Sequence, residues 1–474
     1  MVIPLPHSTT TGNLLQTANA KSLLGEYPAD IFFHLEARRP VPEVLSFTAC
    51  SLDQIEFPPL DHNRMDRLVE NFFELVNQQH PILERADFQK LNRGVWDRSP
   101  GPDVESALAF IVFALGSVAV DKPDTGVQAW LPGVEFFTPA LRVLLALWPS
   151  SFGANFVFPQ ALYLAALYFS YLARPLQSWR LVHMASTNVQ HSWIRCQTLM
   201  QDSSNHLLYQ PLLRVCWAIF VLECDILAEH HLPRSGIEQI IDKLPFPLCG
   251  SPPDRDMLHW LADLSARSML NRAHHVMYSD YPTDSVGENT NPGDLLGGGQ
   301  GSLTSLAKVS AELNRQLYGW FELLPPSIKP DLDKHEPSVD EVTIILRYHA
   351  AGDIIFRPFL LHVCAFPMDK DAPDILVENA LICLHHCREY LLVVSHRVEA
   401  ASGSIEIVLH SALASALILT LASLSPRLAH QVSDIVVLQE KAISLLTKWA
   451  FPGSSIEGML QIALAMRDKR KMIL

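Results

Sequence analysis

Two acidic side chains lie inside a stretch of sequence that otherwise suits only the interior of a protein. Residues 212–227, LLRVCWAIFVLECDIL, are apolar except for Arg214, Glu223 and Asp225, and they contain neither Gly nor Pro. Such a run predicts a buried helix. Because an unpaired charge in a core is costly, the acids need hydrogen-bonding or cationic partners from other parts of the chain.

The length and composition of the chain agree with a large core. The chain has 474 residues, of which 49% are hydrophobic and 18% are charged. This length exceeds the ~250–300 residues over which one core usually grows, so one large or two fused helical domains are expected. The formal net charge of −14 argues against a free-standing nucleic-acid surface, because phosphate binding depends on clustered Lys and Arg.

Helical periodicity through most of the chain predicts an all-α protein, and no sustained alternation of apolar and polar residues indicates a parallel sheet. Residues 1–60 are dotted with prolines, so we expect a loosely structured N-terminal arm with one short helix before a helical domain over 61–474. Residues 279–302, rich in Gly, Asp and Asn, predict a flexible insertion that is a possible subdivision of this domain. The predicted helices cover roughly 61–80, 104–120, 135–148, 158–173, 176–200, 208–230, 256–279, 303–324, 339–366, 373–399, 405–424 and 431–450.

Two segments, 107–120 and 407–424, are apolar enough to raise the question of a membrane span. The first is shorter than the ~20 residues needed to cross hydrocarbon. The second is interrupted by His410 and several serines. Both patterns favour buried core helices. The eight cysteines lie mostly in apolar segments, which indicates free thiols in a reducing compartment.

Local motifs for catalysis or metal binding are sparse. Cys383 and Cys387 lie one helical turn apart, but no second ligand pair is evident nearby, so buried or half-buried helix residues are the favoured interpretation. The histidine pairs at 230–231 and 274–275 are interpreted as helix-end or surface residues, because no HExxH motif accompanies them. No GxSxG motif is present either. The sequence thus supports neither an enzyme nor a cofactor or metal.

Five motifs follow one another along the chain. They are NFFELVNQQHPILERADF at 71–88, VEFFTPALRVLL at 134–145, PQALYLAALYFSYLARPLQSWRLVHMASTNVQ at 159–190, the run at 212–247 with its LPRSGI and LPFP exits, and LRYHAAGDIIFRPFLLHV at 346–363. Together, in this order, they resemble the middle homology region, or regulatory domain, of fungal zinc-cluster transcription factors, over about residues 61–400.

The resemblance marks six signature positions that we expect to be structural: Trp179, Trp217, Glu223, Asp225, Arg357 and Pro358. Pro358 inside an apolar helix removes a backbone donor and frees a carbonyl, so a kink is expected there. Arg357 needs a buried or half-buried partner, and our hypothesis assigns it Glu223 or Asp225.

The chain departs from the family at its N-terminal end. The family usually carries a module in which six cysteines hold two zinc ions, whereas residues 1–60 contain only Cys50 and no CxxC occurs anywhere. The zinc ligands and DNA-reading residues therefore cannot be carried over. The expectation is a nuclear transcription regulator that contacts DNA through a zinc-cluster partner or the transcription machinery. It would have no membrane contact, and a small apolar inducer is possible.

Two other functions compete with this one. The first is a small-molecule sensor or repressor that titrates a partner without any contact to DNA. The second is a helical enzyme, of isoprenoid type, but the acid-rich DDxxD cluster that such enzymes use for magnesium is absent. A basic cluster from Arg467 to Lys471 allows two interpretations, a nuclear import signal or cations that oppose a helix dipole.

Overall fold

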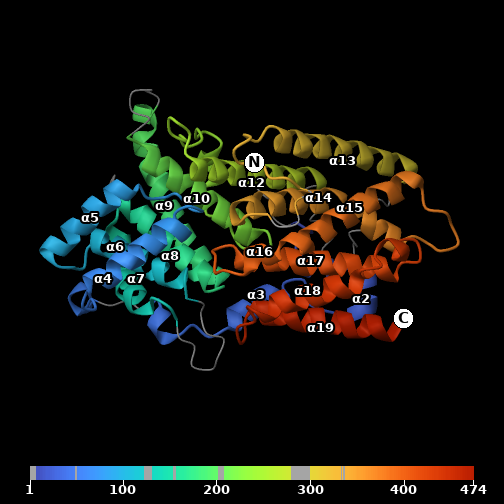
Figure 1. Ribbon diagram of the computed structural model, residues 1–474, viewed down its shortest axis with the longest axis horizontal. Coiled ribbons are helices and arrows are strands. Elements are labelled where there is room, and N and C mark those ends of the chain that lie inside the picture. Colours follow the sequence, from blue (N-terminus) through green and yellow to red (C-terminus); the bar gives the residue numbers. More distant parts are fainter. Residues whose placement is uncertain are drawn as a thin grey trace.

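The structure, a computed structural model, describes residues 7–47, 51–121, 131–152, 156–200, 208–278, 299–332, 334 and 337–473. Every regular element in these ranges is helical, which confirms the all-α class (Figure 1). The helices are α1 (Thr11–Leu14), α2 (Ala18–Leu24), α3 (Ile31–Arg38), α4 (His62–Asn71), α5 (Arg85–Arg98), α6 (Val104–Val118), α7 (Val134–Leu147), α8 (Val157–Tyr171), α9 (Pro175–Met200), α10 (Gln210–Leu227), α11 (Glu238–Ile241), α12 (Arg255–Tyr278), α13 (Gly299–Glu322), α14 (Val339–Ala365), α15 (Asp374–Val393), α16 (Ser395–Val398), α17 (Ile405–Leu424), α18 (Ile435–Thr447) and α19 (Ser455–Ile473).

Most long helices lie where the periodicity predicts them, but two long helices, α5 and α19, were not predicted, and neither was the short helix α11. In α5, Phe88 and Val95 are buried while most of the other side chains are charged or polar, so the apolar signal is weak. The insertion expected over 279–302 falls mostly outside the described residues, and its last four residues begin α13.

The described residues form two large hydrophobic cores. The N-terminal core is built from α4 to α11 with the first half of α12, and the C-terminal core from the second half of α12 with α14, α15 and α17 to α19. Figure 1 shows these two halves side by side. Within α12, Trp260 and Leu264 belong to the first core, and Met269 and Met277 belong to the second. The cores therefore meet inside one helix.

The two most apolar helices are the centres of these cores. α17 is long and apolar enough to cross a membrane, but 83% of its most apolar window is buried inside the protein. α6 is shorter, and every residue from Ser106 to Val118 is buried. Both helices have the burial of core helices, as the sequence analysis expected.

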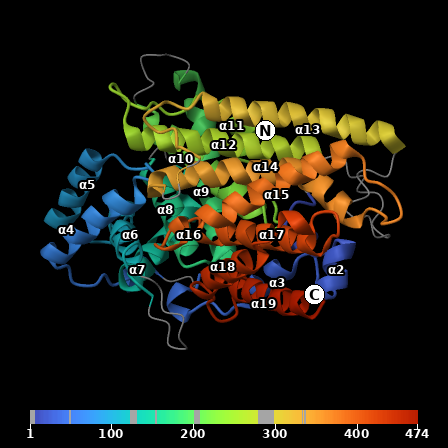
Figure 2. The same cartoon turned by 45° about the vertical axis from the view of Figure 1, so that its right-hand side comes forward.

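The N-terminal segment, residues 7–39, is packed into the molecule, whereas the sequence predicted a loose arm with one short helix. It forms α1, α2 and α3, and its side chains Leu14, Leu24 and Phe32 are buried in the C-terminal core. Figure 2 shows α2 and α3 next to α19. These helices are too short to be stable alone, so their structure depends on tertiary packing that local periodicity does not report.

The first residues of this segment join both halves of the protein. The ring of His7 lies 3.0 Å from the carbonyl oxygen of Leu227, at the end of α10. The backbone N–H of Thr11 donates to Glu229 at 2.8 Å. On the other side, Arg357 of α14 donates to the carbonyl of Thr9 at 2.7 Å. Residues 7–11 thus lie between the two cores and bond to each.

A buried carboxylate ties the end of the same segment to the last helix. Glu36 accepts hydrogen bonds from the backbone N–H of Ser455 at 2.7 Å and from its hydroxyl at 3.0 Å, which satisfies the N-terminus of α19. Arg39 lies 3.3 Å from the other Glu36 oxygen and donates to the carbonyl of Ala173, which follows α8. Both charged side chains are buried.

Glu36→Ala should lower the free energy of unfolding by about 3–5 kcal/mol. The substitution leaves Arg39 as an uncompensated buried cation and removes the acceptor of the Ser455 N–H and hydroxyl. Chemical denaturation measures this change. Asp30→Ala, at an exposed acid of the preceding turn, is the matched control and should have almost no effect. Equal stabilities of the two variants would contradict the role assigned to Glu36.

Candidate functional site

Three of the signature positions hold one irregular stretch, residues 228–247, against the N-terminal core. The indole N–H of Trp179 donates to the Pro233 carbonyl at 3.1 Å, and that of Trp217 donates to the Pro245 carbonyl at 2.9 Å. Glu223 accepts from the backbone N–H of Ser235 at 2.6 Å. These contacts satisfy a buried acid and fix the exit from α10.

Asp225 is the centre of an ionic cluster formed with Asp263, Arg267 and Arg347. Its oxygens accept two hydrogen bonds from Arg347, at 2.7 and 2.8 Å, and one from Arg267 at 3.1 Å. Arg347 also donates to Asp263 at 2.8 Å. Burial alone would raise the pKa of Asp225, but the two guanidinium groups hold it below its usual value. The cluster joins α10, α12 and α14, and therefore joins the two cores.

Arg357 does not pair with Glu223 or Asp225, so the hypothesis from the sequence is wrong. Its guanidinium pairs with Asp353, one turn earlier in α14, and also binds the Thr9 carbonyl. An acid four residues away on the same helix is a local partner, whereas both acids of α10 have partners of their own.

Pro358 lies within α14, which continues to Ala365. The proline cannot donate to the carbonyl of Ile354, four residues earlier. The hydroxyl of Tyr278 donates to that carbonyl at 2.8 Å. The carbonyl freed by Pro358 is thus satisfied by a side chain of α12, which adds a further contact between α12 and α14.

Cys383 and Cys387 are buried, as expected, and their thiols lie 3.6 and 3.5 Å from one carboxylate oxygen of Asp353. Burial raises the pKa of both thiols, so they are protonated and donate to the carboxylate. Their ligand atoms are close enough together to hold a metal ion. However, the charge of Asp353 is already paired with Arg357, which favours a structural role.

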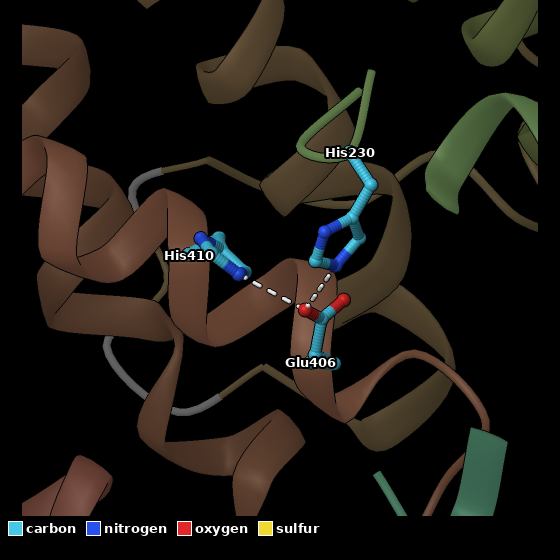
Figure 3. A group of neighbouring side chains, drawn as sticks. All are labelled: His230, Glu406 and His410. Atoms are coloured by element: carbon cyan, nitrogen blue, oxygen red, sulfur yellow. Dashed lines mark hydrogen bonds and ion pairs between the residues drawn. The ribbon is translucent and has the colours of Figure 1, made fainter. Parts of the chain in front are cut away.

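A second cluster with metal-ligand side chains joins the end of α10 to α17. Figure 3 shows the rings of His230 and His410 converging on Glu406, each with Nε2 3.0 Å from the same carboxylate oxygen. Burial raises the pKa of Glu406, but the two imidazoles hold it well below its usual value. The Nδ1 atom of His410 lies 3.3 Å from Glu229.

This cluster was not found from the sequence, because His230 is 176 residues from Glu406. His230 does follow the end of a helix, as expected, but it is fully buried and not at the surface. Two imidazoles and a carboxylate are the ligand types of a divalent metal site, and their ligand atoms all lie within 4.8 Å of one another. The same atoms also satisfy one another by hydrogen bonding across the junction.

A pocket opens between the two cores. Its wall is built from α8, α10, α12, α14, α15, α16 and α17, together with the turn that follows α4. The centres of water molecules can occupy about 130 Å³ of the cavity. On the same measure a single water molecule needs roughly 10–15 Å³. The lining residue Gln78 is exposed and Thr343 is half-buried, so the pocket is open to solvent. It is large enough for a small organic molecule.

The pocket wall combines apolar side chains with a few polar groups, which is typical of small-molecule sites. Apolar contact surface comes from residues such as Val221, Leu222 and Trp260. The hydroxyl of Tyr163 lies 3.1 Å from Nδ1 of His80, and burial lowers the pKa of His80 to about 3, so its ring is neutral. This pocket is our candidate functional site.

No protein-family profile matches the chain, and no curated protein matches it.

Only one of the six signature positions lines the pocket. This residue is Asp225, while Glu223 and Arg357 act elsewhere in the structure. His80, Tyr163 and Arg397 could not be identified from the sequence, because they come from three separate regions of the chain. The only local sign of such a pocket residue in the sequence is a charged or polar side chain within an otherwise apolar helix.

The basic cluster near residue 470 lies at the C-terminal end of α19, where cations oppose the helix dipole. Arg470 is buried and donates to Gln439 at 2.9 Å, and Lys469 donates to the Leu24 carbonyl at 3.0 Å. Arg467 lies beside Glu440 and Asp468. These contacts favour the helix-terminus interpretation of the cluster.

Asp225→Asn should lower the free energy of unfolding by about 3–5 kcal/mol, because buried Arg267 would lose its ion-pair partner and Arg347 would keep only Asp263. Thermal or denaturant unfolding measures the loss. Asp66→Asn, at an exposed position of α4, is the control for the loss of one negative charge. A loss no greater than that of the control would show that the cluster is not needed to join the helices.

The stability of the protein should depend on pH through Glu223. Burial raises the pKa of Glu223 from 4.5 to about 7. Between these values the unfolded chain has lost the proton that the folded chain keeps, so stability falls as the pH rises through this window. Glu223→Gln should remove this slope, of the order of a few kcal/mol in total. Unfolding measured across the window tests it, with Glu378→Gln at an exposed site as control.

Proposed function

We propose that the chain is a transcription regulator of the fungal zinc-cluster type that acts in the nucleus without contacting DNA itself. In this proposal it binds a small molecule between its two cores and reaches DNA through a zinc-cluster protein or the transcription machinery. We assign it a binding role and no catalysis.

The ordered motifs support the regulatory class. Trp179, Trp217 and Glu223 all hold the stretch that follows α10, although they come from two different motifs. The three residues therefore act on one segment although two motifs supply them. This favours one helical body over an accidental similarity of apolar helices.

The pocket is the observation that carries the proposal. Its wall takes side chains from both cores, and the ionic cluster around Asp225 forms part of that wall. A ligand in this place contacts both halves at once and stabilises the arrangement that fits it best. Binding can therefore change a distant surface that recognises a partner, which is what a regulatory domain requires.

The charge of the chain supports recruitment through another protein. A net charge of −14 opposes direct binding to phosphates. The described part of α19 shows that Lys469 and Arg470, which belong to the densest basic cluster, bond to other parts of the chain. A partner that carries its own DNA-binding module removes this difficulty.

The pocket supports a second candidate, a small-molecule sensor that titrates a partner outside the nucleus. The two candidates use the same site and differ in the partner and the compartment. Purification of the tagged full chain from nuclear and cytosolic fractions of a fungal host, followed by mass spectrometry, separates them. Recovery with a zinc-cluster protein or transcription machinery supports the regulator, and recovery only from cytosol without such partners contradicts it.

A pocket-filling variant tests the regulatory role of the cavity. Ala350 lines the pocket, so Ala350→Phe should fill part of it with little loss of stability. We expect the variant to retain its fold but to lose any ligand-dependent change in the set of co-purified partners. Ala86→Phe, on the exposed face of α5, is the control. Identical ligand responses of wild type and Ala350→Phe would exclude the pocket as the regulatory site.

A further inference from the structure

One cation in the pocket wall, Arg397, has no acidic partner among the residues that the structure describes. Arg397 belongs to α16, and only 7% of its surface is exposed. Its guanidinium donates to the side-chain oxygen of Gln79 at 2.7 Å and to the hydroxyl of Ser404 at 3.0 Å. Within the part of the chain that the structure describes, no carboxylate lies at ion-pair distance from Arg397.

An arrangement of this kind is unfavourable in an empty protein. Buried charges are normally paired, because neutral acceptors compensate only part of the lost hydration. Burial lowers the pKa of Arg397, which agrees with incomplete compensation. Arginine nevertheless stays protonated in proteins, so the positive charge remains in the wall.

Two acids of the wall are paired with cations: Asp225 pairs with Arg267 and Arg347, and Asp263 pairs with Arg347. A third lining acid, Asp256, is half-buried near the start of α12. His80 is neutral and so adds no charge. Of the two arginines that line the pocket, Arg347 pairs with acids and Arg397 has no carboxylate at ion-pair distance among the described residues.

The polar groups near Arg397 suit an anionic head group. Ser404, Gln79 and Tyr163 also line the pocket, and each brings a hydroxyl or amide group that can donate to an oxygen. The planar guanidinium matches the two oxygens of a carboxylate. The rest of the wall is largely apolar, with Leu222 and Trp260 among its contact residues.

We propose that the pocket binds an apolar monocarboxylic acid in its ionised form, with the carboxylate paired to Arg397 and the hydrocarbon part against the apolar wall. The inference rests on the proposed ligand-binding function of the same pocket, and it names the chemical class of the ligand. One arginine without an acidic partner, in a wall that also contains three acids, fits one negative charge better than the double charge of a phosphate monoester.

The test uses the purified full chain and two probes of equal length, decanoate and decanamide, in calorimetric titration and thermal unfolding. Decanoate should raise the Tm and bind about ten- to a hundredfold tighter than decanamide, because only the acid forms a charge-assisted bond. Arg397→Gln should remove this preference. Arg397→Lys keeps the charge and should retain part of it, a result that a purely structural role would not give.

Two controls locate the effect. Arg315→Gln, at an exposed arginine of α13, should leave the preference intact. Ala350→Phe should weaken both probes by filling the pocket. Equal binding of acid and amide to the wild type would overturn the proposal of an anionic ligand, whereas the proposed ligand-binding function of the pocket would stand. Failure of every acid and amide from octanoate to dodecanoate to bind would overturn the proposed ligand-binding function as well.

Discussion

The buried carboxylate of Asp225 is the interaction on which the rest of the structure depends. A charge in the middle of an apolar helix must be compensated, and here the compensation comes from α12 and α14. Because Arg267 and Arg347 can satisfy it only from fixed directions, the acid determines how three helices cross. Of these helices, α10 belongs to the N-terminal core, α14 to the C-terminal core and α12 to both. The hydrogen bond from Tyr278 to the carbonyl freed by Pro358 fixes the same pair, α12 and α14, at a second point.

Much of the fold could be predicted from the sequence, because long helices carry their own periodicity. The limits of α17 agree with the prediction, since its apolar run ends sharply at both sides. The N-terminal segment could not be predicted in this way. Its helices span one or two turns, and the burial of Phe32 and Glu36 depends on α17 and α19, which are hundreds of residues away. The local hydrophobic periodicity of these short helices does not indicate which distant helices they contact.

The candidate site was predictable only in part. Acids within an apolar run identified Glu223 and Asp225 as residues that need partners, and both have them. The partner proposed for Asp225 was wrong because charge alone does not distinguish Arg357 from Arg347, which lie on the same helix three turns apart. The pocket itself depends on Arg397 meeting Gln79, 318 residues away. A site assembled from distant single residues gives no spacing that a motif could capture.

The bond between Glu36 and Ser455 has a consequence for how the protein is made. The two residues are 419 positions apart, so at about 5–20 residues per second the ribosome needs roughly 20–80 s to make the intervening chain. During that time Leu14, Leu24 and Phe32 have no completed core to enter, because α19 does not yet exist. This early segment is thus among the last parts of the described chain to be buried. Its apolar side chains stay exposed in the meantime, which is the condition under which chaperones bind nascent chains.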